Sequence, residues 1–137
     1  FAINGIAAYD LSGISVSGAG DINGDGIGDV IIGAASADPN GSNSGQSYVV
    51  FGSKSGFSPS LNLSNLNGSN GFTLNGIATN DSSGISVSNA GDFNGDGIDD
   101  LIIGARDANP NAIARAGQSY LVFGSKSGFS PSLNLSN

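Results

Sequence analysis

Residues 21–29 read Asp-Ile-Asn-Gly-Asp-Gly-Ile-Gly-Asp, and residues 92–100 repeat the pattern as Asp-Phe-Asn-Gly-Asp-Gly-Ile-Asp-Asp. In both stretches an Asp or Asn stands at positions 1, 3, 5 and 9. The Asn-Gly and Asp-Gly pairs predict a tightly turning chain, on which alternate side chains point inward. Ca²⁺ binds six to eight oxygen ligands, often in loops of this kind, so each stretch predicts one calcium site.

Each predicted loop supplies four oxygen-bearing side chains and, at position 7, a backbone carbonyl. The expected ligands are Asp21, Asn23, Asp25, Ile27 and Asp29 in the first loop, and Asp92, Asn94, Asp96, Ile98 and Asp100 in the second. Gly26 and Gly97 allow the positive φ that the turn requires. An EF-hand does not fit, because position 12 is Ile32 or Ile103 where that loop has Glu. Two metal-free hairpin turns are the simpler alternative, but they leave the repeated ligand positions unexplained.

The two loops belong to a repeat that covers the whole chain. When Phe1 is placed over Phe72, the halves agree at most positions, with a period of about 70 residues. Residues 51–65 return unchanged as residues 123–137, and one inserted residue near Arg115 shifts the register. We therefore divide the chain into a first repeat, residues 1–71, and a second repeat, residues 72–137.

Each repeat predicts short strands separated by glycine. Residues 14–17 alternate apolar and polar side chains, and residues 29–32 are a short apolar run ended by Gly33. Residues 47–51 are bounded by Gly45 and Gly52, and residues 72–75 are the expected fourth strand. The long Ser- and Asn-rich connection at residues 53–71 either packs through its leucines or is a disordered linker. Four aromatic residues on the third strands are expected to fill the space between sheets: Tyr48, Phe51, Tyr120 and Phe123.

The composition excludes most catalytic chemistry. The chain has no His, Cys, Met or Trp, and all 11 acidic residues are Asp. Without His or Cys, it cannot form the usual nucleophile pairs or a zinc site of the common type. The Asp residues outside the loops, namely Asp10, Asp38, Asp81 and Asp107, form no recognisable acid and base pair. We therefore expect no enzymatic activity.

The charge points to a cation as partner. The formal net charge is −7, with only four Lys and Arg residues, which argues against nucleic acid or an anionic membrane surface. No apolar run approaches the roughly 20 residues of a membrane-spanning helix, so we expect no membrane insertion. The sequence begins with Phe1, and we expect any export signal to lie outside it.

The repeat resembles the FG-GAP repeat of integrin α-subunit propellers and of many bacterial surface proteins. The resemblance lies in a small-Gly turn, an alternating strand, the Asp-rich loop and a strand ending in Gly-Ala; Ser12-Gly13 and Ser83-Gly84 replace the Phe-Gly of the family name. It implies an all-β fold of four-stranded antiparallel propeller blades, in which the loop between the first two strands binds a structural Ca²⁺. It also implies an extracellular module for binding, cell adhesion or assembly, with a protein or glycan ligand.

Two further interpretations stay open. The chain could be the propeller portion of a secreted polysaccharide-processing enzyme. The close identity of the halves also fits an engineered or amplified repeat whose main property is self-assembly.

The repeats are out of phase with the expected blades. Residues 1–4 match the fourth strand of a blade whose other strands are missing, and the second repeat stops before its own fourth strand. Because propellers have four to eight blades, we expect a homo-oligomer closed by strand exchange, either a tetramer with eight blades or a trimer with six. Residues 1–4 would then complete the blade formed by residues 85–123 of a neighbouring chain.

Overall fold

The computed structural model describes residues 1–136 and is almost entirely β-structure. The strands are β1 (Ala2–Asn4), β2 (Ser15–Gly20), β3 (Asp29–Ala34), β4 (Gln46–Val50), β5 (Ser60–Asn62), β6 (Gly71–Asn75), β7 (Ser83–Gly91), β8 (Asp100–Ala105), β9 (Gln118–Val122) and β10 (Ser132–Asn134). Two single-turn 3₁₀ helices, η1 (Leu63–Asn65) and η2 (Pro110–Ala112), lie in connections. No helix within residues 1–136 is long and apolar enough to cross a membrane.

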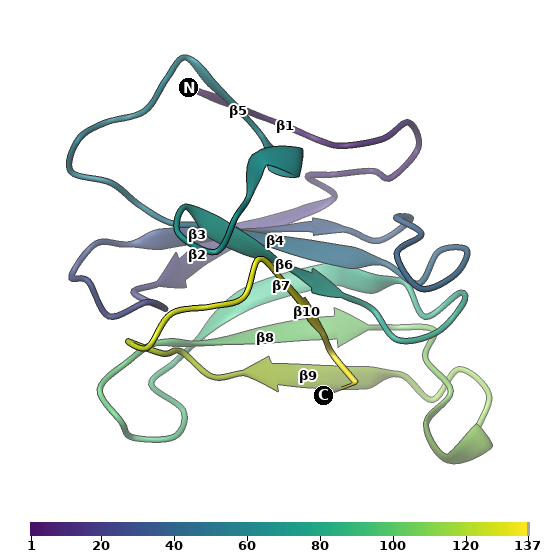
Figure 1. The fold of residues 1–137 in the computed structure, drawn as a ribbon. Helices are drawn as coiled ribbons and strands as arrows, with labels where there is room; N and C mark the ends of the chain where they lie inside the picture. Colours follow the sequence, from purple (N-terminus) through teal and green to yellow (C-terminus); the bar gives the residue numbers. More distant parts are fainter. Residues whose placement is uncertain (137) are drawn as a thin grey trace.

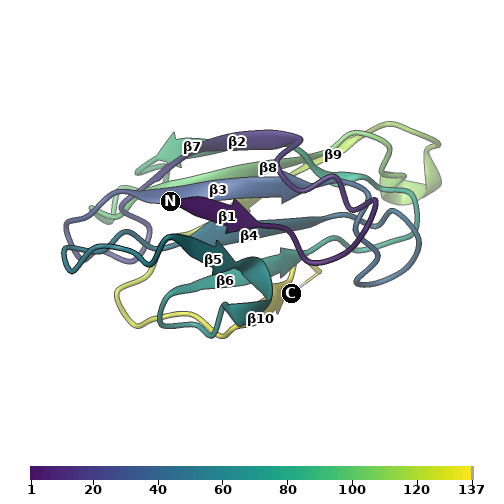
Figure 2. The same cartoon turned by 90° about the horizontal axis from the view of Figure 1, so that it is seen from above.

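The strands form three layers (Figure 1). β1 and β5 make a two-stranded sheet, followed by a five-stranded sheet in the order β10-β6-β4-β3-β2 and a three-stranded sheet in the order β7-β8-β9. Seen from above, β2 and β7 lie together along one edge, and β6 and β10 lie along the opposite edge (Figure 2). Stacked sheets whose first strands converge at one edge are propeller-like blades.

The first blade contains the four antiparallel strands that the sequence predicted. β2 pairs with β3, β3 with β4, and β4 with β6, so that Ile31 lies opposite Val49 and Val49 opposite Phe72. Short apolar runs ended by glycine suit such strands, because each run buries one or both faces and each glycine allows the chain to turn. The second blade has three strands in the same order, which fits the expected end of the second repeat before its fourth strand.

A fifth, parallel strand was not predicted. β10 pairs in parallel with β6, with Leu133 opposite Leu74, and β5 pairs in the same way with β1, with Leu61 opposite Ile3. In both cases the segment after the third strand of one blade reaches back to the fourth strand of the preceding blade. The blade is therefore not purely antiparallel, and its outer edge is covered by the next repeat.

The connection at residues 53–71 is ordered, and the disordered-linker alternative is wrong. It contains β5 and η1, and its Leu63 is completely buried. Leu61 and Leu66 pack against the same cluster, which includes Ile32 and Tyr48 on the outer face of the first blade. The leucines thus hold the connection against the sheet.

The main core lies between the two blades. Ile31, Val49 and Phe72 of the first blade face Leu101 and Ile103 of the second, and all five are fully buried. Each such side chain contributes about 1.5–3 kcal/mol by leaving water. This core fixes the blades relative to each other and so positions the loops at their ends.

The predicted interior position holds for two of the four third-strand aromatics. Tyr48 and Phe51 are buried in the first blade, whereas Tyr120 is only half-buried and Phe123 is 51% exposed. The prediction was wrong for Phe123, because within residues 1–136 the second blade has no further blade against its outer face.

Candidate metal centre

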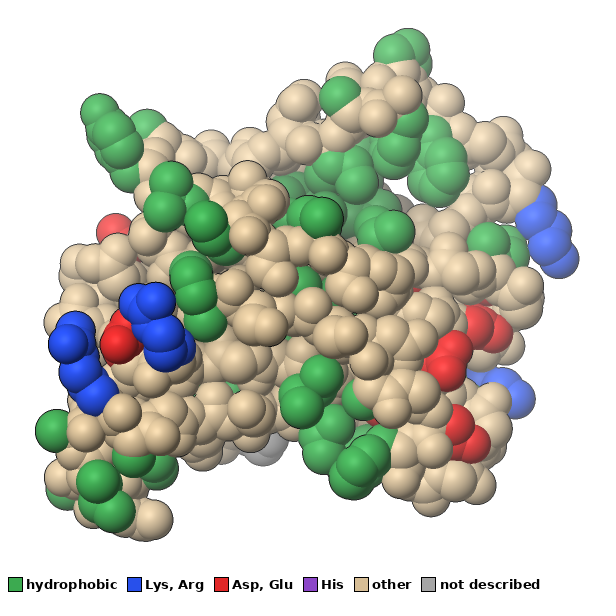
Figure 3. Space-filling view, turned by 180° about the vertical axis from the view of Figure 1, so that it is seen from behind, with side chains coloured by type: hydrophobic (Ala, Val, Ile, Leu, Met, Phe, Trp, Pro, Cys, Tyr) green, Lys and Arg blue, Asp and Glu red, His purple; other side chains and the backbone are tan. Residues whose placement is uncertain are grey.

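The two Asp-rich loops occupy equivalent places in the blades. The first joins β2 to β3 and the second joins β7 to β8, as the family resemblance implied. Both lie at the same side of the stack, and Figure 3 shows acidic side chains gathered along one edge of the molecule. Gly26 and Gly97 have φ of 84° and 86°, so both turns use the glycine conformation that the sequence predicted.

Hydrogen bonds from the backbone shape the first loop around its side chains. Both carboxylate oxygens of Asp21 accept bonds of 2.9 and 2.8 Å, from the N–H groups of Asp25 and Gly26. The Oδ1 atom of Asn23 accepts from Asp25, and the Oδ1 atom of Asp25 accepts from Ile27. The side chains at positions 1, 3 and 5 are therefore held on the inner side of one turn.

The second loop repeats this pattern. Asp92 accepts bonds of 2.9 Å from the N–H groups of Asp96 and Gly97, and Asn94 accepts one of 3.0 Å from Asp96. The Oδ1 atom of Asp96 accepts from Ile98, as in the first loop. The two loops differ in sequence at positions 2 and 8 but adopt the same geometry. The residues that they share therefore determine this geometry.

The Asp at position 9 anchors each loop to its blade. Asp29 is buried, and its two oxygens accept hydrogen bonds from the N–H groups of Ile22 and Gly52, at 3.0 and 2.8 Å. Asp100 is likewise buried and accepts from Phe93 and Gly124, both at 2.9 Å. Each buried carboxylate therefore ties the loop to the end of the third strand.

The carboxylates of the first loop lie close enough to affect one another. Burial is the main cause that raises the pKa of Asp29, and hydrogen bonds from Gly52 and Ile22 oppose it. The negative charges of Asp25 and Asp21 raise the pKa of Asp29 further. A cation placed among these groups would relieve that repulsion.

The donor set fits calcium in its chemistry. Carboxylate, amide and carbonyl oxygens are the ligands of a hard cation, and an oxygen that accepts one N–H bond keeps a second lone pair. Within residues 1–136 no three acidic side chains stand close enough together to enclose a metal ion. Binding of Ca²⁺ would thus require the carboxylates of each loop to converge further. The carbonyls of Ile27 and Ile98 remain predicted ligands, as do the side chains at positions 1, 3, 5 and 9.

The first loop is also held by the second repeat. The N–H of Asp21 donates a bond of 2.8 Å to Oδ2 of Asp99, and the N–H of Ser125 donates one of 2.9 Å to the carbonyl of Ile22. Lys126 lies against Gly24, where an added Cβ would stand 2.5 Å from the lysine Cγ. These contacts join the first candidate metal site to the junction between the blades.

Sequence reasoning missed the glycines that support position 9. Gly52 and Gly124 donate to Asp29 and Asp100, and a Cβ at Gly52 would stand 2.4 Å from the carbonyl oxygen of Gly28. The unchanged Phe-Gly-Ser at residues 51–53 and 123–125 was the available signal. Asp99 was missed as well, because the first loop has Gly28 at that position.

Three of the four acidic residues outside the loops have structural partners. Asp107 forms ion pairs of 2.9 and 3.6 Å with Arg106 and Arg115, and the hydrogen bond from Arg106 lowers the pKa of Asp107. Oδ1 of Asp38 accepts from the N–H of Asn43, and Oδ2 of Asp81 accepts from the N–H of Ala78.

The repeats match a known family. The sequence model of the family described as FG-GAP repeat matches residues 12–50 and residues 83–122, which together make up more than half of the chain. The chain belongs to the FG-GAP repeat family. Each match runs from the start of a blade's first strand or the turn just before it, through the Asp-rich loop, to the end of the third strand.

One relative is an enzyme of much greater length. The chain is 33% identical over 109 residues to phosphatidylinositol-glycan-specific phospholipase D of Bos taurus. The similarity covers 79% of this chain but 13% of the relative. The chain therefore corresponds to a small part of that protein.

Proposed function

We propose that this FG-GAP repeat pair is a calcium-stiffened β-propeller module with one Ca²⁺ in each loop. The observation that carries the proposal is the duplicated loop geometry, in which the same hydrogen bonds hold the side chains of positions 1, 3, 5 and 9 in both repeats. Oxygen-only ligands around clustered carboxylates favour Ca²⁺ over softer metals. The ion is structural in this account, because it would connect the first two strands of a blade.

The module serves as a non-catalytic scaffold for binding, adhesion or assembly. Outside the cell, millimolar calcium would saturate even weak sites, which favours an extracellular location. The chain offers no activated nucleophile for catalysis, and Asp38, Asp81 and Asp107 outside the loops are engaged with arginines or backbone N–H groups. A protein or glycan is the proposed ligand class.

The match to the phospholipase supports a second candidate. The relative is named as a phospholipase and the similarity covers 13% of it, so this chain could be the non-catalytic part of a larger enzyme. The two candidates share the calcium sites and differ in what the propeller is joined to.

Thermal unfolding with and without calcium tests the shared claim. Each occupied site stabilises the folded chain by about 2.7 kcal/mol when free Ca²⁺ is a hundred times its dissociation constant. We expect EGTA to lower the melting temperature of the intact chain substantially. Asp25→Ala and Asp96→Ala should each lose about half of this calcium-dependent shift, since each removes a central ligand from a separate loop.

Asp38→Ala is the matched control, because Asp38 lies outside both loops. It should keep the full shift between calcium and EGTA. An intact chain that melts at the same temperature in both conditions contradicts the proposal, as does an equal loss of the shift in the Asp38 variant.

A further inference from the structure

The chain is rich in Asn-Gly pairs, in which an asparagine can be chemically modified by its own backbone. The backbone nitrogen of the glycine can attack the side-chain amide carbon of the asparagine, because glycine has no side chain to hinder the approach. The attack requires a glycine N–H that is free of hydrogen bonds, and it is faster when a donor stabilises the negative charge that develops on the amide oxygen. The chain has seven such pairs, namely Asn4-Gly5, Asn23-Gly24, Asn40-Gly41, Asn67-Gly68, Asn70-Gly71, Asn75-Gly76 and Asn94-Gly95.

The pair Asn23-Gly24 in the first Asp-rich loop meets both requirements. The Oδ1 atom of Asn23 accepts a hydrogen bond of 3.0 Å from the N–H of Asp25, so a donor already stands where the negative charge would develop. The Nδ2 atom of Asn23 donates a bond of 3.2 Å to the carboxylate of Asp25, which fixes the orientation of the amide. The N–H of Gly24 donates no hydrogen bond within residues 1–136.

The pair Asn94-Gly95 in the second loop has the same surroundings. The Oδ1 atom of Asn94 accepts a bond of 3.0 Å from the N–H of Asp96, and its Nδ2 atom donates one of 2.9 Å to the carboxylate of Asp96. The N–H of Gly95 is also free of hydrogen bonds in the part of the chain that the structure describes. Both loops therefore prepare the asparagine at position 3 for attack.

The next glycine of each loop provides a contrast. Asp25-Gly26 could close the same kind of ring, but the N–H of Gly26 donates a bond of 2.8 Å to the carboxylate of Asp21. The second loop repeats this bond at 2.9 Å. The glycine nitrogen at position 4 is therefore free, whereas the one at position 6 is engaged.

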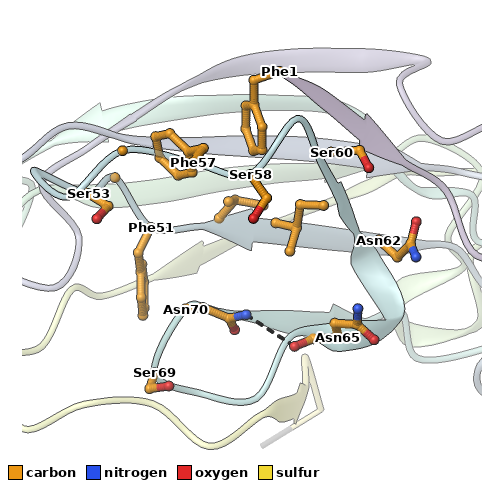
Figure 4. Close-up of a pocket in the computed structure, with 14 residues that line it drawn as sticks. Phe1, Phe51, Ser53, Phe57, Ser58, Ser60, Asn62, Asn65, Ser69 and Asn70 are labelled. Atoms are coloured by element: carbon orange, nitrogen blue, oxygen red, sulfur yellow. Dashed lines mark hydrogen bonds between the residues drawn. The ribbon is translucent and has the colours of Figure 1, made fainter.

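Three of the other pairs have a glycine nitrogen that is engaged or buried. The N–H groups of Gly68 and Gly76 donate hydrogen bonds of 2.8 Å to backbone carbonyls. Gly71 is buried and begins β6, so attack on Asn70 would require the end of this strand to open. Figure 4 shows the turn before β6, where the side chain of Asn70 donates a bond of 3.1 Å to the carbonyl of Asn65.

The two remaining pairs lack the donor on the amide oxygen. The Oδ1 atoms of Asn4 and Asn40 accept no backbone hydrogen bond within residues 1–136. Their Nδ2 atoms donate to Asn62 and to the carbonyl of Gly76, at 3.0 and 2.8 Å. Only the two loop pairs thus combine a free glycine N–H with a polarised amide among the described residues.

Solvent reaches the first loop while the blades are packed. Asn23 and Gly24 are half-buried, although Lys126 of the second repeat lies against Gly24. Water can therefore take part in the reaction without unfolding of the chain.

We propose that Asn23 and Asn94 are sites of spontaneous deamidation in the folded chain. The nitrogen of Gly24 or Gly95 forms a bond to Cγ of the preceding asparagine. The bond from Cγ to Nδ2 breaks, and Nδ2 leaves as ammonia with the proton of the glycine N–H, which solvent transfers. Water then opens the five-membered succinimide at either carbonyl and gives aspartate or isoaspartate. The reaction needs no calcium, so it can be tested separately from the proposed function.

Deamidation changes position 3 of each candidate metal loop. Aspartate adds one negative charge beside Asp21 and Asp25, in a chain whose net charge is already −7. Isoaspartate inserts a CH₂ group into the backbone and displaces the side chain. If position 3 binds a cation, as the proposed function holds, both products alter a ligand, and the loops change as the chain ages.

Peptide mapping by mass spectrometry tests the proposal after incubation of the intact chain in mildly alkaline buffer with EGTA. Trypsin cleaves after Lys54 and Arg106, so the two sites fall in different peptides, each with further Asn-Gly pairs as internal references. Fragmentation assigns each site, and an isoaspartate-specific methyltransferase detects that product.

We expect Asn23 and Asn94 to deamidate first. Asn67 should react about two- to tenfold more slowly, because the N–H of Gly68 must first break its hydrogen bond. In guanidinium chloride, where the fold is lost, all seven pairs should react at similar rates.

Variants with a longer side chain assign the reaction. Asn23→Gln and Asn94→Gln cannot form the five-membered ring, so each should lose one site and keep the other. Asn67→Gln is the matched control and should keep both, and circular dichroism checks that each variant is folded. The proposal is overturned if Asn67 reacts as fast as the two loop asparagines in the folded chain. It is also overturned if the loop asparagines deamidate in the unfolded chain but not in the folded one.

Discussion

The backbone N–H of Asp21 donates a hydrogen bond of 2.8 Å to the Oδ2 atom of Asp99, 78 residues further along the chain. The bond joins position 1 of one candidate calcium loop to position 8 of the other. It means that the first loop is shaped by its own repeat and also by the next one. Blade stacking and loop geometry are therefore coupled in this molecule.

Removing the acceptor should weaken the contact between the blades. We expect Asp99→Ala to lower the free energy of unfolding by about 1–2 kcal/mol, in the range of a charge-assisted hydrogen bond at a partly exposed position. Asp99→Asn loses the same charge but keeps an oxygen that can accept, so it should cost less. Urea unfolding measures both variants, and equal losses would show that the hydrogen bond is not the cause.

When calcium is absent, replacing the buried aspartate at position 9 of a loop should lower the free energy of unfolding more than replacing the exposed aspartate at position 5. Asp29→Ala leaves the buried N–H of Ile22 and the partly buried N–H of Gly52 without their acceptor, which should lower the free energy of unfolding by about 1–3 kcal/mol for Ile22 and by less for Gly52. Asp25→Ala removes an exposed carboxylate that accepts a hydrogen bond from the N–H of Ile27. It should lower the free energy of unfolding by less than about 1 kcal/mol, which is the contribution of one hydrogen bond at the surface. Urea unfolding in EGTA compares them. A loss at Asp25 as large as that at Asp29 would contradict the anchoring role.

The close approach at Gly52 predicts a packing defect. In Gly52→Ala the new Cβ would stand 2.4 Å from the carbonyl oxygen of Gly28, so the strand end must move away from the loop. We expect a loss of about 1–3 kcal/mol, as for other overpacked sites. Gly18→Ala is the control, because no atom lies within 4 Å of its added Cβ. Similar melting temperatures for the two variants would contradict this prediction.

Buried Tyr48 should make the fold sensitive to alkali. Burial, with a smaller contribution from Asp10, raises the pKa of Tyr48 to about 12. From pH 10 to about 12 the unfolded chain releases this proton while the folded chain keeps it, so the free energy of unfolding falls as pH rises. Below pH 10 this stabilisation is fully present.

Unfolding in urea across that range measures the effect. Tyr48→Phe should show a smaller fall in stability between pH 10 and 12 than the intact chain. Tyr9→Phe, at a 90% exposed position, should behave like the intact chain. If the free energy of unfolding of Tyr48→Phe falls as much between pH 10 and 12 as that of the intact chain, groups other than Tyr48 cause the fall.

The sequence predicted the main strands and the loops because both depend on local pattern. Alternation around Val16 and the apolar run at Val30 indicated strands, and the glycines at position 6 indicated the loop turns. The structure confirms those elements. The calcium ligands remain a prediction.

The parallel strands and the supporting contacts could not be predicted in this way. β5 and β10 are three residues long, lie in a Ser- and Asn-rich segment, and pair with strands 58 and 59 positions away, so no local period marks them. Gly52 supports Asp29 through a backbone N–H, which every residue except proline carries. Such contacts depend on the tertiary arrangement rather than on residue type.

Calorimetric titration with Ca²⁺ tests the central claim most directly, because it counts the ions that each chain binds. The account predicts two ions for the intact chain, one for Asp25→Ala, one for Asp96→Ala, and none for the double variant. It also predicts two for Asp38→Ala, which changes an aspartate outside the loops. An intact chain that binds no Ca²⁺ at millimolar concentration, or single variants that still bind two ions, would contradict it.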